Sequence, residues 1–462
     1  MVSIFKYLHH GLLLNGPSVF QDVATPQQAA VEQYNIVRYL GGSAPYIQHP
    51  GFGVSTEIPA QCSLQQVHLL SRHGERYPSK GDGVYFESVL EKFNKYEQPF
   101  KGELSFLNTY KYFVTNKDYY EKETSPENSR GPYAGTSDEL RHGSAFRAKY
   151  GGLLQKNGVL PVFTSNSGRC YQSAQYFARG LLGDEYRDNK VKFVVISEDS
   201  NMGVNSLTPR YACKNFNGDL NKDKIQSYET TYLQNILNRF QKSNPGLDLS
   251  LNDVSSLFLW CAFEINVKGY SPFCELFNNE EFIKSGYKTD LGNYYSTGPG
   301  NPITKTVGSA MVGAYLKLLS DDSSDNKVWL SFTHDTDIEM YLSSLGILEP
   351  SEPLPADRVP FPNPYSSAEM LPQGARLYTE KYKCGDKSYV RYILNDAVIP
   401  IKQCSKGPGF SCEFSEYQSY VNDRISGLDF SNQCGLQSGT PSQLTFYWDY
   451  NNKNYDAPLI DS

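Results

Sequence analysis

Short apolar segments along the chain have the length and composition of buried β-strands. Four of them cover residues 65–72, 161–165, 192–197 and 328–333. Runs of this length, rich in valine, leucine and phenylalanine, favour strands over helices. A fifth segment, 388–401, predicts two strands joined by a turn at Asn395-Asp396.

Other segments repeat their apolar residues at the spacing of an α-helix. They cover residues 85–93, 168–182, 230–240 and 336–346, and the last should end near Gly346. Two of these helices directly follow a predicted strand, an alternation that is typical of α/β folds.

The alternation predicts an α/β fold with two lobes. We expect a large α/β domain with a central mixed sheet flanked by helices, and a smaller, mostly α-helical domain inserted into it. With 462 residues the chain is long enough for both. The expected boundaries are an N-terminal arm at 1–50, the α/β domain at 51–80, 156–215 and 290–462, and the helical lobe at 81–155 and 216–289.

Cationic and acidic residues cluster where three of the predicted strands end. They are Arg72, His73 and Arg76 after the first strand, Arg169 after the second, and His334 and Asp335 after the strand at 328–333. Ligands of α/β sheets usually bind at the carboxyl ends of the strands, and helix N-termini offer free N–H groups to anions. The three segments therefore predict a common phosphate site.

Several other classes of protein are disfavoured. The net charge of −7 and pI of about 5.6 argue against a nucleic-acid binder. No apolar run approaches ~20 residues, so we expect no membrane span, and the N-terminal residues make a poor secretory core. The zinc-protease His-Glu-x-x-His, the P-loop Gly-Lys and the serine-hydrolase Gly-x-Ser-x-Gly motifs are missing.

The nine cysteines indicate an oxidising compartment. None forms a Cys-x-x-Cys pair, so a zinc knuckle or thioredoxin-type site is disfavoured. We favour a secreted disulfide protein with one thiol left over, and the alternative is a cytosolic protein with nine reduced cysteines. Spacing alone does not choose among the possible pairings.

The stretch "RHGERYP" at 72–78 has the composition that phosphoryl transfer requires. A neutral imidazole can attack phosphorus and form a phosphohistidine. Arginine pairs two phosphate oxygens at once and keeps its charge at any working pH. Arg72 and Arg76 flank His73, and Gly74 permits a tight bend beside it. The alternative is a set of surface cations that follow a strand.

This stretch matches the signature of the histidine acid phosphatases, and "SFTHDTDI" at 331–338 resembles the second signature of that family. The similarity continues through "TSNSGRC" (164–170), "QGARLYTEKY" (373–382), "VRYILNDAVIPI" and "PGFSCE" (408–413), and covers most of the chain from about residue 40. The chain most resembles the branch of yeast secreted acid phosphatases and phytases.

The resemblance implies a role for each matching residue. His73 corresponds to the nucleophile and Asp335 to the proton donor. The phosphate cradle comprises Arg72, Arg76, Arg169 and His334. The resemblance also implies four disulfides, Cys62–Cys384, Cys213–Cys434, Cys261–Cys274 and Cys404–Cys412, which leave Cys170 single. Neither a metal nor a cofactor is expected, because arginines supply the charge stabilisation.

A second Arg-His-Gly occurs at 141–143. It lies in a segment, 137–154, that predicts a helix capped by Ser137, with Leu140, Phe146 and Tyr150 on its apolar face. No arginine or proline follows in the required register. We therefore expect His142 to be a helix side chain, with the edge of the substrate cleft as the alternative.

Together these features predict a secreted phosphomonoesterase that works at acid pH, with the polyanion phytate as the expected substrate. Lys80 and Lys268 are candidate additional phytate-binding cations, although solvated surface lysines are more common. The alternatives are a broad-specificity acid phosphatase, a phosphomutase of the same superfamily, and an inactive binding protein on this scaffold. For the oligomeric state the alternatives are a homo-oligomer, which the N-terminal arm favours, and a monomer.

Overall fold

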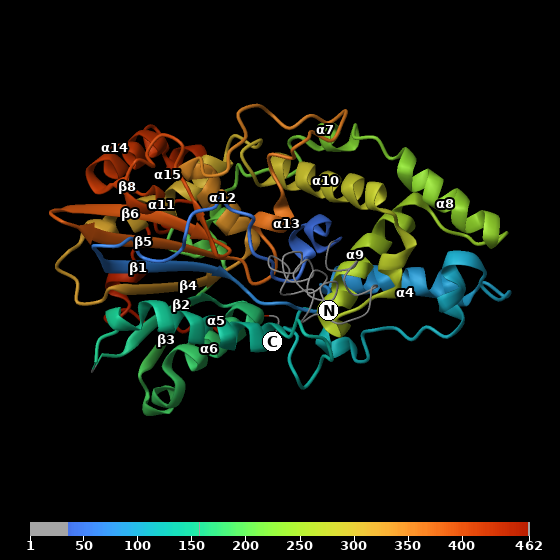
Figure 1. Ribbon diagram of the computed structural model, residues 1–462, viewed down its shortest axis with the longest axis horizontal. Helices are drawn as coiled ribbons and strands as arrows, with labels where there is room; N and C mark the ends of the chain where they lie inside the picture. Colours follow the sequence, from blue (N-terminus) through green and yellow to red (C-terminus); the bar gives the residue numbers. More distant parts are fainter. Residues whose placement is uncertain (1–35, 157, 461–462) are drawn as a thin grey trace, which may run out of the picture.

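A mixed eight-stranded sheet organises the larger part of the protein in the computed structural model, which describes residues 36–156 and 158–460 (Figure 1). The strands are β1 (Cys62–Arg72), β2 (Leu160–Ser165), β3 (Val191–Ile196), β4 (Val328–Thr333), β5 (Arg376–Cys384), β6 (Lys387–Leu394), β7 (Ala397–Ile399) and β8 (Cys412–Glu413). Their order is β3-β2-β4-β1-β5-β6-β7, with β8 beside β6. This confirms the α/β class and the mixed sheet.

The four strands predicted first form the parallel half of the sheet. β1 pairs with β4, β4 with β2, and β2 with β3, all parallel, whereas β5 to β8 pair antiparallel. Because β2, β4 and β1 are neighbours that run in one direction, their carboxyl ends meet at one edge of the sheet. That edge carries the three charged junctions.

Helices cover both faces of the sheet. On one face α5 (Gly135–Tyr150) and α6 (Gly168–Leu182) pack their aromatic side chains against apolar residues of β1, β2 and β4. On the other lie α11 (Thr304–Ser320), α12 (Asp335–Leu345) and α14 (Phe414–Ile425). Figure 1 shows these two layers below and above the strands. The short helices are α7 (Lys222–Gln226), α13 (Ser367–Met370), α15 (Phe430–Gln433) and α16 (Phe446–Asp449).

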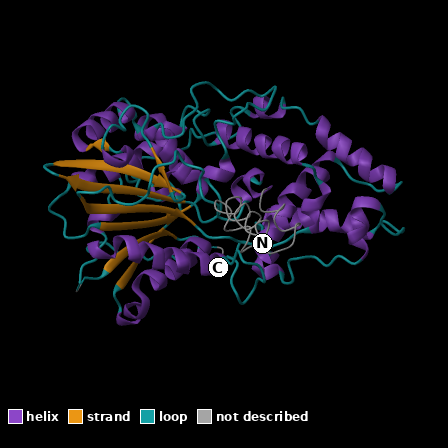
Figure 2. Cartoon of the chain, in the orientation of Figure 1, coloured by secondary structure: helices purple, strands orange, loops and turns teal. Residues whose placement is uncertain are grey.

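Four long helices lie away from the sheet, at the right of Figure 1, and Figure 2 shows only helices and loops in that part of the chain. They are α4 (Lys80–Asn94), α8 (Thr231–Ser243), α9 (Leu251–Lys268) and α10 (Asn279–Ser296). The division into two lobes stays a prediction. At one helix the structure differs from it, because α5 falls in the range assigned to the helical lobe but packs with α6 on the sheet.

Two details predicted for the helix at 137–154 are wrong, namely its N-cap and one residue of its apolar face. Helix α5 begins at Gly135, with Ala134 as N-cap and no side-chain cap, so Ser137 lies inside the helix. Leu140, expected on the apolar face, is 41% exposed, whereas Phe146 and Tyr150 are buried. The helix starts early because the Gly135 N–H already has a partner, the hydroxyl of Thr124, at 2.9 Å.

The predicted arm is described only from residue 36, and residues 1–35 lie outside the described part. From there to residue 50 it packs on its own body, where Ile36, Val37 and Leu40 are buried. Asn266 of α9 donates a hydrogen bond to the Ser43 carbonyl at 3.0 Å. The arm thereby joins the helical part of the chain to the sheet.

The cysteines pair as the resemblance implied. The structure contains the disulfides Cys62–Cys384, Cys213–Cys434, Cys261–Cys274 and Cys404–Cys412, and Cys170 is a buried free thiol. Within residues 36–156 and 158–460, no helix has both the length and the apolar character that crossing a bilayer demands.

Candidate active site

The three charged junctions meet at the carboxyl edge of the parallel strands. Arg72, the last residue of β1, pairs in the sheet with Thr333, the last residue of β4. The Nη2 atom of Arg72 lies 2.9 Å from Oδ2 of Asp335, and the rings of His73 and His334 are 5.9 Å apart. Arg169 lies in the first turn of α6, directly after β2. Six residues from three distant segments thus form one cluster.

His73 has the protonation state of a nucleophile. Its Nδ1 lies 2.8 Å from the carbonyl oxygen of Gly74, which can only accept, so Nδ1 carries the proton. The lone pair of the neutral ring is therefore on Nε2. Burial, followed by the charges of Arg72 and Arg169, holds the pKa of His73 well below 6.5. Burial and the neighbouring arginines therefore favour the neutral ring.

The arginines around His73 are fixed by the protein but keep hydrogen-bonding capacity. Arg72 Nη1 donates to the carbonyls of Gly42 and Leu371, the second at 2.6 Å. Arg76 donates to the Tyr77 carbonyl at 2.8 Å. Among the described residues the buried Nε–H groups of Arg72 and Arg76 have no acceptor. Such groups favour an anionic ligand that accepts from them.

The crowding of positive charges also affects the pKa of Arg76. Burial, Arg169 and Arg72 lower the pKa of Arg76 to about 10. Glu121 forms an ion pair with Arg169 at 3.2 Å. The arginines of the cradle therefore repel one another, and a bound phosphate would relieve that repulsion.

His334 is a cation in this site. Its Nε2 lies 2.6 Å from a carboxylate oxygen of Glu198, and both side chains are largely buried. Burial by itself would lower the pKa of His334, but the contact with the Cys170 sulfur and the Glu198 carboxylate outweigh it and raise the pKa to about 10. His334 therefore adds a fourth positive charge to the cradle.

Asp335 begins α12, where the first free N–H groups of the helix hold its carboxylate. The Thr336 N–H donates to Oδ1 at 2.9 Å, and Arg72 holds Oδ2. Burial would raise the pKa of Asp335, but Arg72 and His334 overcome that effect and lower it to about 2. Without a bound phosphate, Asp335 is a carboxylate.

The two lysines expected to bind substrate have different surroundings. Lys80 is exposed at the start of α4, and its backbone N–H donates to Glu121 at 2.9 Å. Because Glu121 also pairs with Arg169, Lys80 is connected to the rim of the cradle. The Lys268 ammonium instead pairs with Glu264 at 2.7 Å, which offsets its charge.

His142 is a buried side chain of α5, as expected. Its Nδ1 lies 3.1 Å from Glu139, and its Nε2 lies 2.6 Å from the Tyr378 hydroxyl. Both ring nitrogens have protein partners, so the alternative at the edge of the cleft is not supported. Burial lowers the pKa of His142 well below 6.5.

The acidic partners of the cradle were not predicted from the sequence. Glu198 follows β3 and holds His334, although 136 positions separate the two residues. Glu121 holds Arg169 across 48 positions. One signal was available for Glu198, because it comes directly after a predicted parallel strand, where functional residues gather. Nothing in the local sequence marks Glu121.

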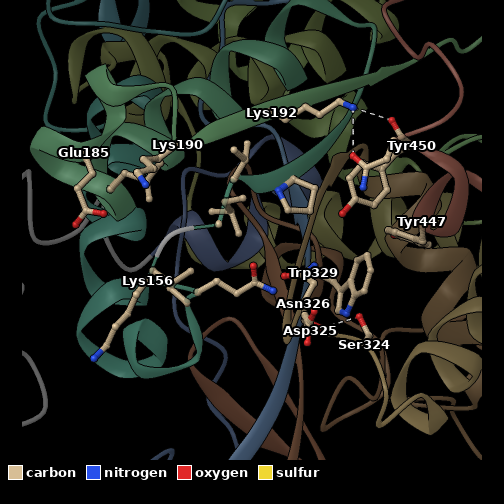
Figure 3. A pocket seen from close by; sticks show the side chains of 18 of the residues that line it. Lys156, Glu185, Lys190, Lys192, Ser324, Asp325, Asn326, Trp329, Tyr447 and Tyr450 are labelled. Atoms are coloured by element: carbon tan, nitrogen blue, oxygen red, sulfur yellow. Dashed lines mark hydrogen bonds between the residues drawn. The ribbon is translucent and has the colours of Figure 1, made fainter.

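Two further features lie apart from this cluster. A pocket of about 720 Å³ at the amino ends of β2, β3 and β4 contains Lys156, Lys190 and Lys192, and none of the six residues of the cluster lines it (Figure 3). Among the described residues, one group of possible metal ligands is closely spaced, namely Cys404, Cys412 and Glu416. The two cysteines form a disulfide and offer no thiolate.

Comparisons with known proteins agree with this geometry. The model of the "Histidine phosphatase superfamily (branch 2)" matches residues 63–395. "Phytase PHO112" of Candida albicans is 57% identical over 99% of this chain and all of its own length. "Probable acid phosphatase DIA3" of Saccharomyces cerevisiae is 43% identical over 93% of this chain and 92% of its own.

A solved structure shows the same fold. The crystal structure of the phytase from D. castellii superposes with a TM-score of 0.91 at 57% identity, and the match covers 96% of each chain. The described fold, the two signatures and these matches lead to one conclusion. The chain belongs to branch 2 of the histidine phosphatase superfamily.

Proposed function

We propose that this protein hydrolyses phosphomonoesters at acid pH through a phosphohistidine on His73. One observation carries the proposal. His73 is a buried neutral imidazole whose Nδ1–H is committed to Gly74, and it lies among Arg72, Arg76 and Arg169. A nucleophile without charge, surrounded by fixed cations, suits attack on an anionic phosphate.

In the first step the Nε2 lone pair of His73 forms a bond to phosphorus while the bond from phosphorus to the ester oxygen breaks. The guanidinium groups and protonated His334 stabilise the charge on the remaining phosphate oxygens. Asp335 gives its proton to the departing alkoxide, which leaves as an alcohol. In the second step Asp335 takes a proton from water, and the water oxygen bonds to phosphorus as the bond from phosphorus to Nε2 of His73 breaks. Inorganic phosphate leaves, and the neutral imidazole of His73 is restored.

Asp335 must carry a proton when the alcohol departs, although its pKa is about 2 in the free site. A bound phosphate shares Arg72 with Asp335 and places negative charge beside the carboxylate. Both effects raise the pKa of Asp335. Acid solution favours the same protonated form, while His73 remains neutral there because its own pKa is lowered. At acid pH these effects favour a protonated Asp335 and a neutral His73, the two forms that the proposed reaction requires.

Phytate is the substrate that we propose. The relatives named above include a phytase at 57% identity and a phytase structure at the same identity. Phytate carries several phosphates, so cations at the rim of the cradle should bind those not being hydrolysed. Lys80 is the better candidate because it adjoins the cradle, whereas Lys268 is already paired. A broad-specificity acid phosphatase is the second candidate, since other relatives carry that name.

We also propose that the protein is secreted, since four disulfides are typical of an oxidising compartment. That compartment disfavours a metabolic phosphomutase. An inactive binding protein is disfavoured because the nucleophile, the cations and Asp335 are all retained in one cluster.

Release of inorganic phosphate at pH 4–5 tests this function, with phytate and p-nitrophenyl phosphate compared in the presence of EDTA. Faster release from phytate supports a metal-independent phytase. Similar kcat/KM values for both substrates indicate a general acid phosphatase with the same chemistry. Failure to release phosphate from either substrate would contradict the enzymatic function.

A further inference from the structure

A segment remote from both signatures runs alongside the nucleophile loop. The Tyr77 N–H donates to the Lys122 carbonyl at 2.9 Å, and the Thr124 N–H donates to the Glu75 carbonyl at 2.8 Å. These bonds hold residues 122–124 against residues 75–77 in the manner of a short antiparallel pair. The side chain between them, Glu123, is fully buried and points to the loop.

Glu123 and Ser173 hold the backbone of Gly74. The Gly74 N–H lies 2.8 Å from Oε1 of Glu123 and 2.9 Å from the Ser173 hydroxyl oxygen. The Ser173 hydroxyl in turn donates to the same Glu123 oxygen. Ser173 comes from α6, four residues after Arg169 of the cradle. Two side chains from segments that are distant in sequence therefore bind the same backbone N–H group.

Gly74 is also the residue that fixes the tautomer of His73, because its carbonyl accepts the Nδ1–H at 2.8 Å. A shift of this glycine would turn the imidazole or release its proton. We propose that Glu123 and Ser173 are positioning residues for the nucleophile, which they orient through the backbone of Gly74. This inference rests on the proposed function and adds two residues to it.

The packing around Gly74 supports this role. A Cβ atom at this position would lie 2.9 Å from the Glu123 carboxyl and 3.0 Å from the backbone of Gly135. The loop therefore lies in direct contact with the carboxyl and with the first residue of α5. If Glu123 is truncated, the Gly74 N–H loses one of its two hydrogen-bond acceptors, and the loop loses the carboxyl against which it packs.

The charge of Glu123 also suits a neighbour of His73. Burial raises the pKa of Glu123 to about 8. The hydrogen bonds from Ser173 and Gly74 oppose this shift, and the nearby Glu75 adds to it. The carboxyl is then neutral at acid pH and does not draw a proton onto His73. Glutamine has nearly the same shape, is neutral and keeps the accepting oxygen, so it should serve in place of Glu123.

The test compares three variants with the wild-type protein, using p-nitrophenyl phosphate at pH 4–5. Glu123→Ala should lower kcat about 10- to 100-fold with KM changed by less than about twofold, since a misplacement near 1 Å costs up to ~10² in rate. Glu123→Gln should retain kcat within about threefold. Activity of the wild-type protein tests the proposed function separately from this inference.

Asp253→Ala is the matched control. One oxygen of Asp253 likewise accepts from a backbone N–H and a serine hydroxyl, both of Ser250, but it does so at the start of α9, away from the nucleophile loop. This variant should lose thermal stability and keep kcat. The inference is overturned if Glu123→Ala keeps kcat within about twofold, if Glu123→Gln is as slow as Glu123→Ala, or if Asp253→Ala lowers kcat equally.

A spectroscopic readout covers the case in which Glu123→Ala folds poorly. Ser173→Ala keeps the Glu123 acceptor and removes one of the two partners of Gly74. ¹⁵N NMR of His73 should show the proton on Nδ1 in the wild-type protein and a larger share of the other tautomer in Ser173→Ala. An unchanged tautomer together with an unchanged kcat in this variant would also overturn the inference.

Discussion

Replacing Asp335 by asparagine removes the proposed proton donor and leaves the rest of the site in place. Asparagine has the same size and can still accept from the Thr336 N–H, which lies 2.9 Å from Oδ1. It cannot transfer a proton to the leaving oxygen. Positioned general acids typically contribute 10²–10⁴ in rate. That range corresponds to about 3–5 kcal/mol of activation free energy.

The size of the loss should depend on the leaving group. An alkyl phosphate such as glycerol phosphate releases a strongly basic alkoxide that needs the proton, whereas p-nitrophenolate is stable without it. For Asp335→Asn we expect kcat to fall about 10²- to 10⁴-fold for the alkyl ester and less than about tenfold for the aryl ester. Initial rates of phosphate release at pH 4–5 measure both.

The neighbour Asp337 provides the control. It lies on the same helix, accepts from the Thr333 hydroxyl at 3.2 Å and lies 3.8 Å from Arg210. Within the described part of the chain, no hydrogen bond or ion pair joins it to His73 or Arg72. Asp337→Asn should therefore change the rates of both substrates by the same small factor. Equal slowing of both substrates by Asp335→Asn would refute the assignment of Asp335 as the acid.

The remaining predictions concern the nucleophile and the cradle. His73→Ala should abolish turnover while the thermal transition stays near that of the wild type, and substantial activity in the folded variant would contradict the nucleophile. Arg169→Ala should lower kcat/KM for p-nitrophenyl phosphate about 10²- to 10³-fold, by analogy with oxyanion donors; a loss below about threefold would remove it from the cradle. Glu198→Gln should move the basic limb of the pH–rate profile to lower pH. The Glu198 carboxylate helps to raise the pKa of His334, so without it that pKa falls and His334 loses its positive charge at a lower pH. An unchanged profile would count against His334 as a required cation.

The positions of the strands and of the charged junctions were predictable because each depends on local sequence. β4 spans Val328–Thr333 as predicted, and α12 ends at Leu345, followed by the C-cap Gly346, which adopts a left-handed conformation with φ of 68°. An apolar run followed by charged residues and then a helical pattern suffices to place a ligand at the carboxyl edge of a sheet. The residue types at that edge predict a phosphate site, and the family resemblance implies the role of each residue.

Two kinds of feature were not predictable from local patterns. The helix α9 is buried on nearly every side, so its apolar residues show no single stripe that would reveal it. The partners that set the charges of the site, Glu198 and Glu121, meet His334 and Arg169 only after the chain has folded. Their carboxylates are ordinary in sequence, and their effect on pKa comes from proximity and burial.

Trapping the covalent intermediate tests the central claim most directly. The wild-type protein would be mixed with ³²P-labelled p-nitrophenyl phosphate, quenched in alkali to preserve phosphohistidine, and digested for mass spectrometry. The account predicts label on Nε2 of His73, because Nδ1 is committed to Gly74. Label on another residue, or turnover in single-turnover experiments without any labelled protein, would contradict a mechanism through His73.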